Sequence, residues 1–105
     1  MGIAKDSIES LKLKARISDF VLASTSGKLR GNKGMAICPF HGEKTASMSF
    51  TDEENLFHCF GCKEGGDIFK YVQLINNIEF QDSVEVVAEK YAFNLKYTNS
   101  SFESN

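Results

Sequence analysis

Two short stretches, Cys38-Pro39-Phe40-His41 and Cys59-Phe60-Gly61-Cys62, stand seventeen residues apart and each carry a pair of soft metal-ligand side chains. In each stretch two residues separate the pair, so a tight turn brings both side chains to one side, and Gly61 eases the positive φ that such turns often need. Structural zinc sites are almost always four-coordinate, with Cys and His ligands. The spacing therefore predicts one structural Zn²⁺ held by Cys38, His41, Cys59 and Cys62.

Other uses of these cysteines are less consistent with the sequence. Three cysteines cannot pair off completely, and the chain has no signal peptide or apolar run of membrane length, which disfavours an extracellular disulfide framework. A thioredoxin-like redox pair should open a helix after a buried strand, and it would leave Cys38 and His41 unexplained. His58 is a fifth potential ligand, but its neighbour Cys59 should face the metal, and successive side chains of an extended segment point to opposite faces. We therefore expect His58 to face away.

Composition indicates one small domain. With 105 residues, of which 42% are hydrophobic and 25% charged, the core is at the lower end of self-sufficiency, so zinc should contribute to folding. The net charge of −2 does not by itself indicate a nucleic-acid partner. Residues 1–50, however, carry eight Lys or Arg against four Asp or Glu, whereas residues 51–105 carry four against ten. This distribution predicts a bipolar surface.

Periodicity predicts helices at both ends of the chain and strands between them. Helical spacing is expected near residues 6–14, 17–22, 68–75 and 80–91, the last from the apolar stripe Phe80, Val84, Val87, Ala88 and Tyr91. Residues 47–50 and 56–60 should form a hairpin that delivers Cys59. The segment containing Gly31 and Gly34 is expected to be extended and irregular, and Gly65-Gly66-Asp67 to be a flexible approach with an N-cap.

The residues around the ligands resemble a known family. Residues 37–45, Ile-Cys-Pro-Phe-His-Gly-Glu-Lys-Thr, followed by Phe57-His58-Cys59-Phe60-Gly61-Cys62 and Gly65-Gly66, are similar to the CHC2 zinc finger, the N-terminal zinc-binding domain of bacterial DnaG-type DNA primases. The resemblance covers roughly residues 8–95 and is far more specific than Cys-x-x-Cys alone. It implies an α+β fold, a small zinc-ribbon-like antiparallel sheet flanked by N- and C-terminal helices. Residues 1–97 would form this domain, with 98–105 as a tail or the start of a linker.

The resemblance also implies a function. Such a domain recognises the single-stranded DNA template on which an RNA primer starts during DNA replication, while the polymerase chemistry lies in a separate domain. The chain alone is therefore expected to have no catalytic residues. Its expected partners are the template, a primase RNA-polymerase domain in cis or in trans and a replicative helicase, without a membrane. The expected location is the cytoplasm, in a bacterial or phage replisome.

This chain departs from the family pattern at three places. It has Thr45-Ala46-Ser47-Met48 where Thr-Pro-Ser-Phe is usual, Gly34 where an aromatic residue is common, and Lys63 where a small residue usually follows the last cysteine. The four ligands are untouched, so the differences bear on template preference.

Basic residues interleaved with rings support nucleic-acid binding. Lys28 and other Lys and Arg side chains flank the two motifs, and exposed rings stack on unpaired bases for about 1–3 kcal/mol each. Phe57 is a further candidate ring. The alternative to nucleic-acid binding is that two of the three rings Phe57, His58 and Phe60 belong to the core and that the cations form a solvated face. The predicted DNA contacts are Arg30, Lys33, Lys44, His58, Phe60 and Lys63.

Two rival functions remain open. His41-Gly42-Glu43 with Cys59 and Cys62 is similar to the signature of zinc deaminases, but Cys38 would fill the position that the attacking water needs. The other rival is a zinc-stapled interaction module that docks on a polymerase or helicase.

Overall fold

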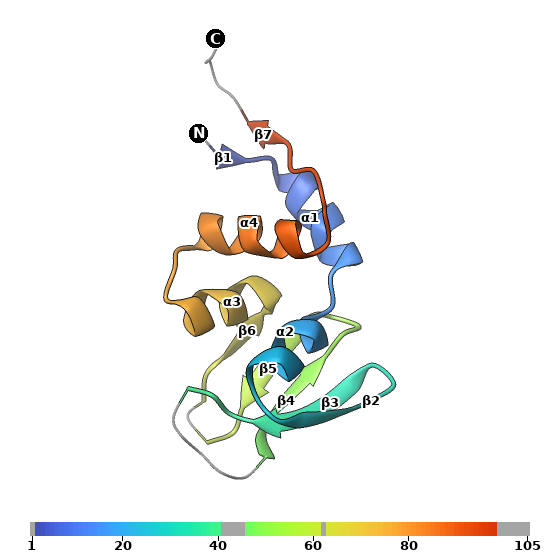
Figure 1. Cartoon of the computed structure of the whole chain (residues 1–105), viewed down its shortest axis with the longest axis vertical. Helices are drawn as coiled ribbons and strands as arrows, with labels where there is room; N and C mark the ends of the chain where they lie inside the picture. The colour runs from blue at the N-terminus through green and yellow to red at the C-terminus, as the bar shows by residue number, and fades with distance from the viewer. Residues whose placement is uncertain (1, 41–45, 62, 99–105) are drawn as a thin grey trace.

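The computed structural model describes residues 2–40, 46–61 and 63–98, shown as a ribbon in Figure 1. None of the helices in these ranges is both long and apolar enough to cross a membrane. The elements in chain order are β1 (Gly2–Ile3), α1 (Lys5–Lys14), α2 (Ile17–Ser24), β2 (Gly27–Arg30), β3 (Lys33–Ile37), β4 (Ala46–Thr51), β5 (Leu56–Cys59), β6 (Gly65–Asp67), α3 (Ile68–Asn76), α4 (Phe80–Lys90) and β7 (Tyr97–Thr98).

The architecture is an antiparallel sheet with helices on one side. Strands β2 to β6 form a five-stranded sheet in the order β2-β3-β4-β5-β6, and α2 and α3 pack against it. Helix α4 packs on α3, α1 contacts α4, and a separate two-stranded sheet of β1 and β7 lies at the end of the molecule far from the large sheet (Figure 1). The expected α+β fold, a small antiparallel sheet flanked by N- and C-terminal helices, is confirmed.

Local sequence signals explain several of the element boundaries. Helix α2 ends where Thr25 adopts an extended conformation. Helix α3 is preceded by its N-cap Asp67, whose carboxylate accepts a hydrogen bond from the Lys70 N–H at 2.9 Å. Asn77 ends α3 in the left-handed conformation, with a φ of 56°, which asparagine tolerates better than most residues. The predicted hairpin of β4 and β5 is present, with Thr51 opposite Leu56.

The sequence patterns did not predict strands β1, β2, β6 and β7. The segment expected to be irregular is a regular hairpin of β2 and β3, which turns at Gly31 with a φ of 63°. All four residues of β2 are exposed, so no alternation marks it as a strand. Strand β6 is Gly-Gly-Asp, a composition of low β-propensity, and it is a strand because β5 supplies its hydrogen-bonding partner.

The core lies between the sheet and the helices. It contains apolar residues from every layer, including Leu11, Met48 and Phe69, each at most 1% exposed. The rings of Phe40, Phe57 and Tyr71 contact one another with centroids 5.2 to 5.9 Å apart. This ring cluster places the first predicted knuckle against β5 and α3.

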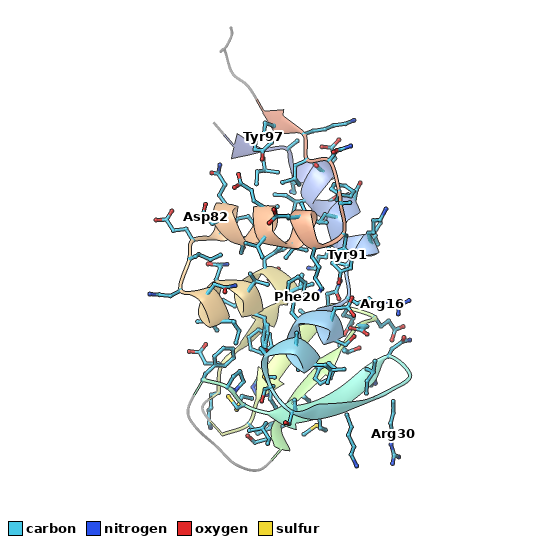
Figure 2. The ribbon with its side chains drawn as sticks, in the orientation of Figure 1. Arg16, Phe20, Arg30, Asp82, Tyr91 and Tyr97 are labelled. Carbon is cyan, nitrogen blue, oxygen red and sulfur yellow. The ribbon has the colours of Figure 1, made fainter. Side chains whose placement is uncertain are left out.

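The stripe on α4 is only partly core. Val84, Val87 and Ala88 are buried, but Phe80 is 45% exposed. The Tyr91 hydroxyl accepts a hydrogen bond from the Arg16 N–H at 3.0 Å and donates to the Asp19 carboxylate at 2.6 Å (Figure 2). Burial and the adjacent Asp19 carboxylate raise the pKa of Tyr91, so the phenol stays protonated, and can donate to Asp19, at more alkaline pH than an ordinary tyrosine.

The N-terminus of α2 is capped by the turn between β4 and β5, which is distant from it in the sequence. Arg16, the N-cap residue of α2, makes no side-chain cap. Instead the Asp52 carboxylate accepts from the Ser18 N–H at 2.8 Å and from the Ser18 hydroxyl at 2.6 Å. The first of these bonds satisfies the Ser18 N–H, which has no partner within the first turn of the helix.

Asn55 in the same turn joins the sheet to both N-terminal helices. It is 3% exposed and has a φ of 54°. Its Oδ1 accepts from the Ile17 N–H at 2.9 Å, and its Nδ2 donates to the carbonyls of Lys12 and Ala15 at 2.7 and 3.0 Å. One side chain therefore holds the α1–α2 junction against the β4–β5 turn.

We predict that Asn55→Ala lowers the free energy of unfolding by about 3 kcal/mol, because it leaves buried backbone groups without partners. Denaturant titration of the zinc-loaded chain measures this. Asn77→Ala is the matched control: Asn77 is also left-handed, but it is exposed, so its replacement should cost only about 1 kcal/mol. Equal losses for the two variants would contradict the role assigned to Asn55.

Candidate metal centre and nucleic-acid interface

Two of the predicted ligands, Cys38 and Cys59, lie at the same end of the large sheet. Strand β4 separates their strands, and its residue Met48 stands opposite Ala36 of β3 on one side and Cys59 of β5 on the other. Cys38 lies just beyond β3, two residues after Ala36, so its side chain points to the same face of the sheet as that of Ala36. Both cysteines are buried, at 1% and 0% exposed.

The backbone near these two cysteines forms tight turns. The Phe40 N–H donates to Cys38 Sγ at 3.5 Å, two residues along the chain. In the second motif the Cys59 carbonyl accepts from the Lys63 N–H at 2.9 Å, while the Cys59 N–H donates to the Glu64 carbonyl at 2.8 Å. The Phe40 N–H, which is aimed at the Cys38 sulfur, would stabilise its thiolate, the form that binds metal.

The other two predicted ligands, His41 and Cys62, lie outside the described residues, as do Glu43 and Lys44. Within the described ranges no group of three His, Cys, Asp or Glu side chains is arranged to hold a metal. The two ligands that are described fit zinc: they are soft donors, buried, placed at one sheet end and set in tight turns.

Lys63 occupies a strained position just after the second motif. Its φ is 63°, in the left-handed region, and its side chain is exposed. That conformation costs a residue with a Cβ about 1 kcal/mol relative to glycine, which gives a physical reason for a small residue at this place.

The candidate rings separate into buried and exposed members. Phe57 is 3% exposed and belongs to the core ring cluster. His58 is exposed on the opposite face from Cys59, as alternation predicts, and Phe60 is 63% exposed. The His58 and Phe60 rings meet edge to face, with centroids 4.8 Å apart, so they form one exposed aromatic pair.

The predicted cations near the sheet are also exposed. Arg30 and Lys33 stand opposite each other across β2 and β3, and Lys28 stands opposite Met35. Figure 2 shows Arg30 extending from the sheet away from the helices.

An open groove of about 900 Å³ covers the sheet face that lies away from the helices. It brings together Arg30, Lys33 and His58, and Phe60 contacts His58 beside it. Met35, Ser49, Thr51 and Leu56 also line this surface, although no sequence motif marked them as candidates; the signal that could have found them is the two-residue period of the predicted strands. The lining residues are Lys28, Arg30, Lys33, Gly34, Met35, Ser49, Phe50, Thr51, Glu54, Leu56, Phe57, His58, Gly65 and Gly66.

Charge is divided between this groove and the far side of the molecule. Asp82, Glu85 and Glu89 line a second concave surface, on α4. Among the described residues that line the groove on the sheet, Lys28, Arg30 and Lys33 are basic and Glu54 alone is acidic. The bipolar surface expected from the sequence is therefore present in the described residues.

Gly34 is required by close packing beneath the groove. A Cβ at this position would lie 2.4 Å from the Lys28 carbonyl oxygen and 2.5 Å from the Phe50 ring. The ring of Phe50 thus fills the space where a side chain on residue 34 would stand.

Comparison with known proteins identifies the family. The sequence model of the CHC2 zinc finger family matches residues 3–103 of this chain. DNA primases of Campylobacter jejuni and Mycolicibacterium smegmatis are 39% and 38% identical over 97% and 90% of this chain, and a Staphylococcus aureus DNA primase is 33% identical over all of it. The chain spans only 15 to 17% of the length of these relatives.

A solved structure shows the same fold. The crystal structure of the Aquifex aeolicus primase, comprising its zinc binding and RNA polymerase domains, superposes with a TM-score of 0.75 and 27% identity, over 92% of this chain and 24% of that one. Because the family match covers residues 3–103 and the turns at Cys38 and Cys59 agree with it, this chain belongs to the CHC2 zinc finger family, and the proteins that it matches are bacterial DNA primases.

Proposed function

We propose that this chain is the part of a DNA primase that recognises the single-stranded DNA template where RNA primer synthesis starts. The observation that carries the proposal is the open groove on the sheet, which joins exposed cations to an exposed aromatic pair. Lys and Arg bind phosphates without regard to sequence, and rings stack on unpaired bases. Duplex DNA offers no free base faces for such stacking, so the groove suits a single strand.

One structural zinc ion is proposed to be held by Cys38, His41, Cys59 and Cys62. When bound, the metal supplies folding free energy, because a closed set of four protein ligands leaves no position for substrate. The chain's own residues position the exposed rings. The turns at Cys38 and Cys59 are anchored in the core, and they fix the end of β5 that carries these rings.

The catalytic residues of primer synthesis are proposed to lie outside this chain. The relatives are about six times longer, and the matched Aquifex structure includes an RNA polymerase domain. The proposed partners are therefore the template and such a polymerase domain, in cis or in trans, with a replicative helicase as a further partner. The proposed location is the cytoplasm, at a bacterial or phage replisome. The division into a domain of residues 1–97 and a tail or linker of 98–105 is part of this proposal.

A docking module for a polymerase or helicase is the second candidate. The acidic concave surface on α4 is the observation that favours it, since such a surface complements a basic protein partner better than DNA. The two functions are compatible because they use opposite sides of the molecule. A zinc deaminase is disfavoured, since Cys38 lies buried with Cys59 at one sheet end, where a fourth protein ligand would exclude the attacking water.

The purified chain should contain one zinc per molecule, and Cys59→Ser or Cys62→Ser should unfold it, because zinc binding and folding are coupled. Elemental analysis and far-UV circular dichroism measure the two effects. His58→Ala is the control: it removes an imidazole next to Cys59 that faces the other side, so zinc content should stay at one. Loss of zinc from that variant would mean that the ligand set is wrong.

The chain alone should neither polymerise ribonucleotides nor deaminate cytidine or adenosine, since its metal is saturated by protein ligands. Primer synthesis should appear only when a matching polymerase domain is added. Deaminase turnover that disappears in Glu43→Gln would overturn this assignment.

Charge reversal at Lys33 or Lys44 should weaken binding to all single-stranded templates about equally and lower the salt dependence, because phosphate contacts carry no sequence information. His58→Ala and Phe60→Ala should instead reduce discrimination between templates. Fluorescence titration at two salt concentrations separates these effects. Asp82→Lys on the far side is the charge control. If charge reversal at Lys33 and Lys44 changes neither the affinity for DNA nor primer initiation, the docking module becomes the better supported function.

A further inference from the structure

The outer face of the sheet is organised in two rows that cross the strands. Antiparallel pairing aligns one row through Arg30, Lys33, Thr51 and Leu56. A second row, two residues along each strand, runs through Lys28, Met35, Ser49, His58 and Gly65. Every one of these residues lines the groove. We name them the Thr51 row and the Ser49 row.

Both rows repeat the same chemistry from one edge of the groove to the other. Each has a cation on β2, a hydroxyl on the central strand β4, and a side chain that can lie against a base on β5. The base-facing side chain is Leu56 in one row and His58 in the other, and both are exposed. Phosphate would therefore bind toward β2 and bases toward β5.

The distance between the rows determines which conformation of a DNA strand can bind to both of them. Two residues along a β-strand span about 7 Å. Stacked nucleotides advance only about 3.4 Å per phosphate, so neighbouring rows match nucleotides that have been pulled apart to about twice that spacing. An unstacked strand exposes the edges of its bases to hydrogen-bonding groups on the floor of the groove.

The hydroxyls on β4 have unused hydrogen-bonding capacity, although Thr51 Oγ1 is covered by protein atoms in the unliganded chain, so a base would reach it only after neighbouring side chains move. Thr51 Oγ1 is the one buried side-chain polar atom in the described residues that has no hydrogen-bond partner. Leaving a buried hydroxyl unpaired is unfavourable, and a hydroxyl can both donate and accept. With the described residues, the Ser49 hydroxyl makes one long hydrogen bond, 3.4 Å, to the His58 carbonyl, so it too has capacity for a ligand.

We infer that the groove reads two adjacent, unstacked template nucleotides, one on each row, and that the hydroxyls of Thr51 and Ser49, together with the exposed rings, determine which bases are accepted. This inference rests on the proposed function, since it assumes that the groove binds single-stranded DNA. Leu56 and His58 lie against the base faces, while Lys28, Arg30 and Lys33 hold the phosphates. Thr51 and Ser49 are thus specificity-determining residues.

The test uses the zinc-loaded chain and fluorescent single-stranded DNAs that carry every base combination at two adjacent positions in a constant background. Thr51→Val removes the hydroxyl and keeps the shape of the side chain; Ser49→Ala removes the second hydroxyl. Each variant should reduce base discrimination about five- to tenfold at one position, and the two variants should affect neighbouring positions. Binding averaged over all DNAs, its salt dependence and zinc content should not change.

Two controls keep the result specific. Thr51→Ser retains a hydroxyl and should keep the discrimination that Thr51→Val loses. Ser10→Ala removes an exposed hydroxyl from α1, far from the groove, and should have no effect. The unliganded Thr51→Val chain should melt at the same or a higher temperature than the parent, because the unpaired hydroxyl is gone.

The outcomes separate this inference from the function on which it rests. If the chain binds DNA with a salt dependence that Lys33→Glu lowers, but shows no base preference or a preference that neither hydroxyl variant changes, the two-row inference is overturned and the proposed function stands. Loss of discrimination at the same single position in both variants also overturns the two-row arrangement. If the parent chain binds no single-stranded DNA, both fail.

Discussion

The alternation of side chains along β5 is the constraint on which both functional regions depend. Phe57 and Cys59 point toward the helices, where one joins the core ring cluster and the other joins Cys38 at the predicted metal centre. Leu56 and His58 point the opposite way and line the groove. Because the period of a strand is two, a shift of register by one residue would expose Cys59 and bury His58. Metal binding and the composition of the groove are thus set by the same register.

That register is secured by packing around the strand. Met48 of β4 is fully buried between Ala36 and Cys59, and the Phe57 ring contacts Tyr71 of α3 with centroids 5.2 Å apart. A domain of this size buries a modest core, so a metal bound at the proposed site, which joins the ends of two strands, would contribute a large share of the stability. The ring cluster and the proposed zinc site would then stabilise the same end of the sheet together.

A second set of interactions holds the helices on the sheet. Asp52 and Asn55 cap and anchor α2 through a turn more than thirty residues away in sequence, and the Tyr91 hydroxyl joins the end of α4 to Arg16 and Asp19. Buried polar groups of this kind stabilise a fold only when their hydrogen bonds are made, so they select one arrangement of the layers. Keeping all the helices on one side leaves the other side of the sheet open to a ligand.

The sequence by itself determined the features that depend on neighbours along the chain. Ligand spacing predicted the two turns, the apolar period predicted α1, α3 and α4, Asp67 marked the start of α3, and alternation placed His58 opposite Cys59. The sequence did not reveal β2 and β6, because an exposed strand and a glycine-rich strand are defined by their hydrogen-bonded partners rather than by their own residues. Only the tertiary structure decided that Lys28, Ser49 and His58 share a row, since cross-strand register depends on turn lengths and on a β-bulge after Ala36. The same holds for Asn55, whose partners come together only when the sheet and the N-terminal helices have packed.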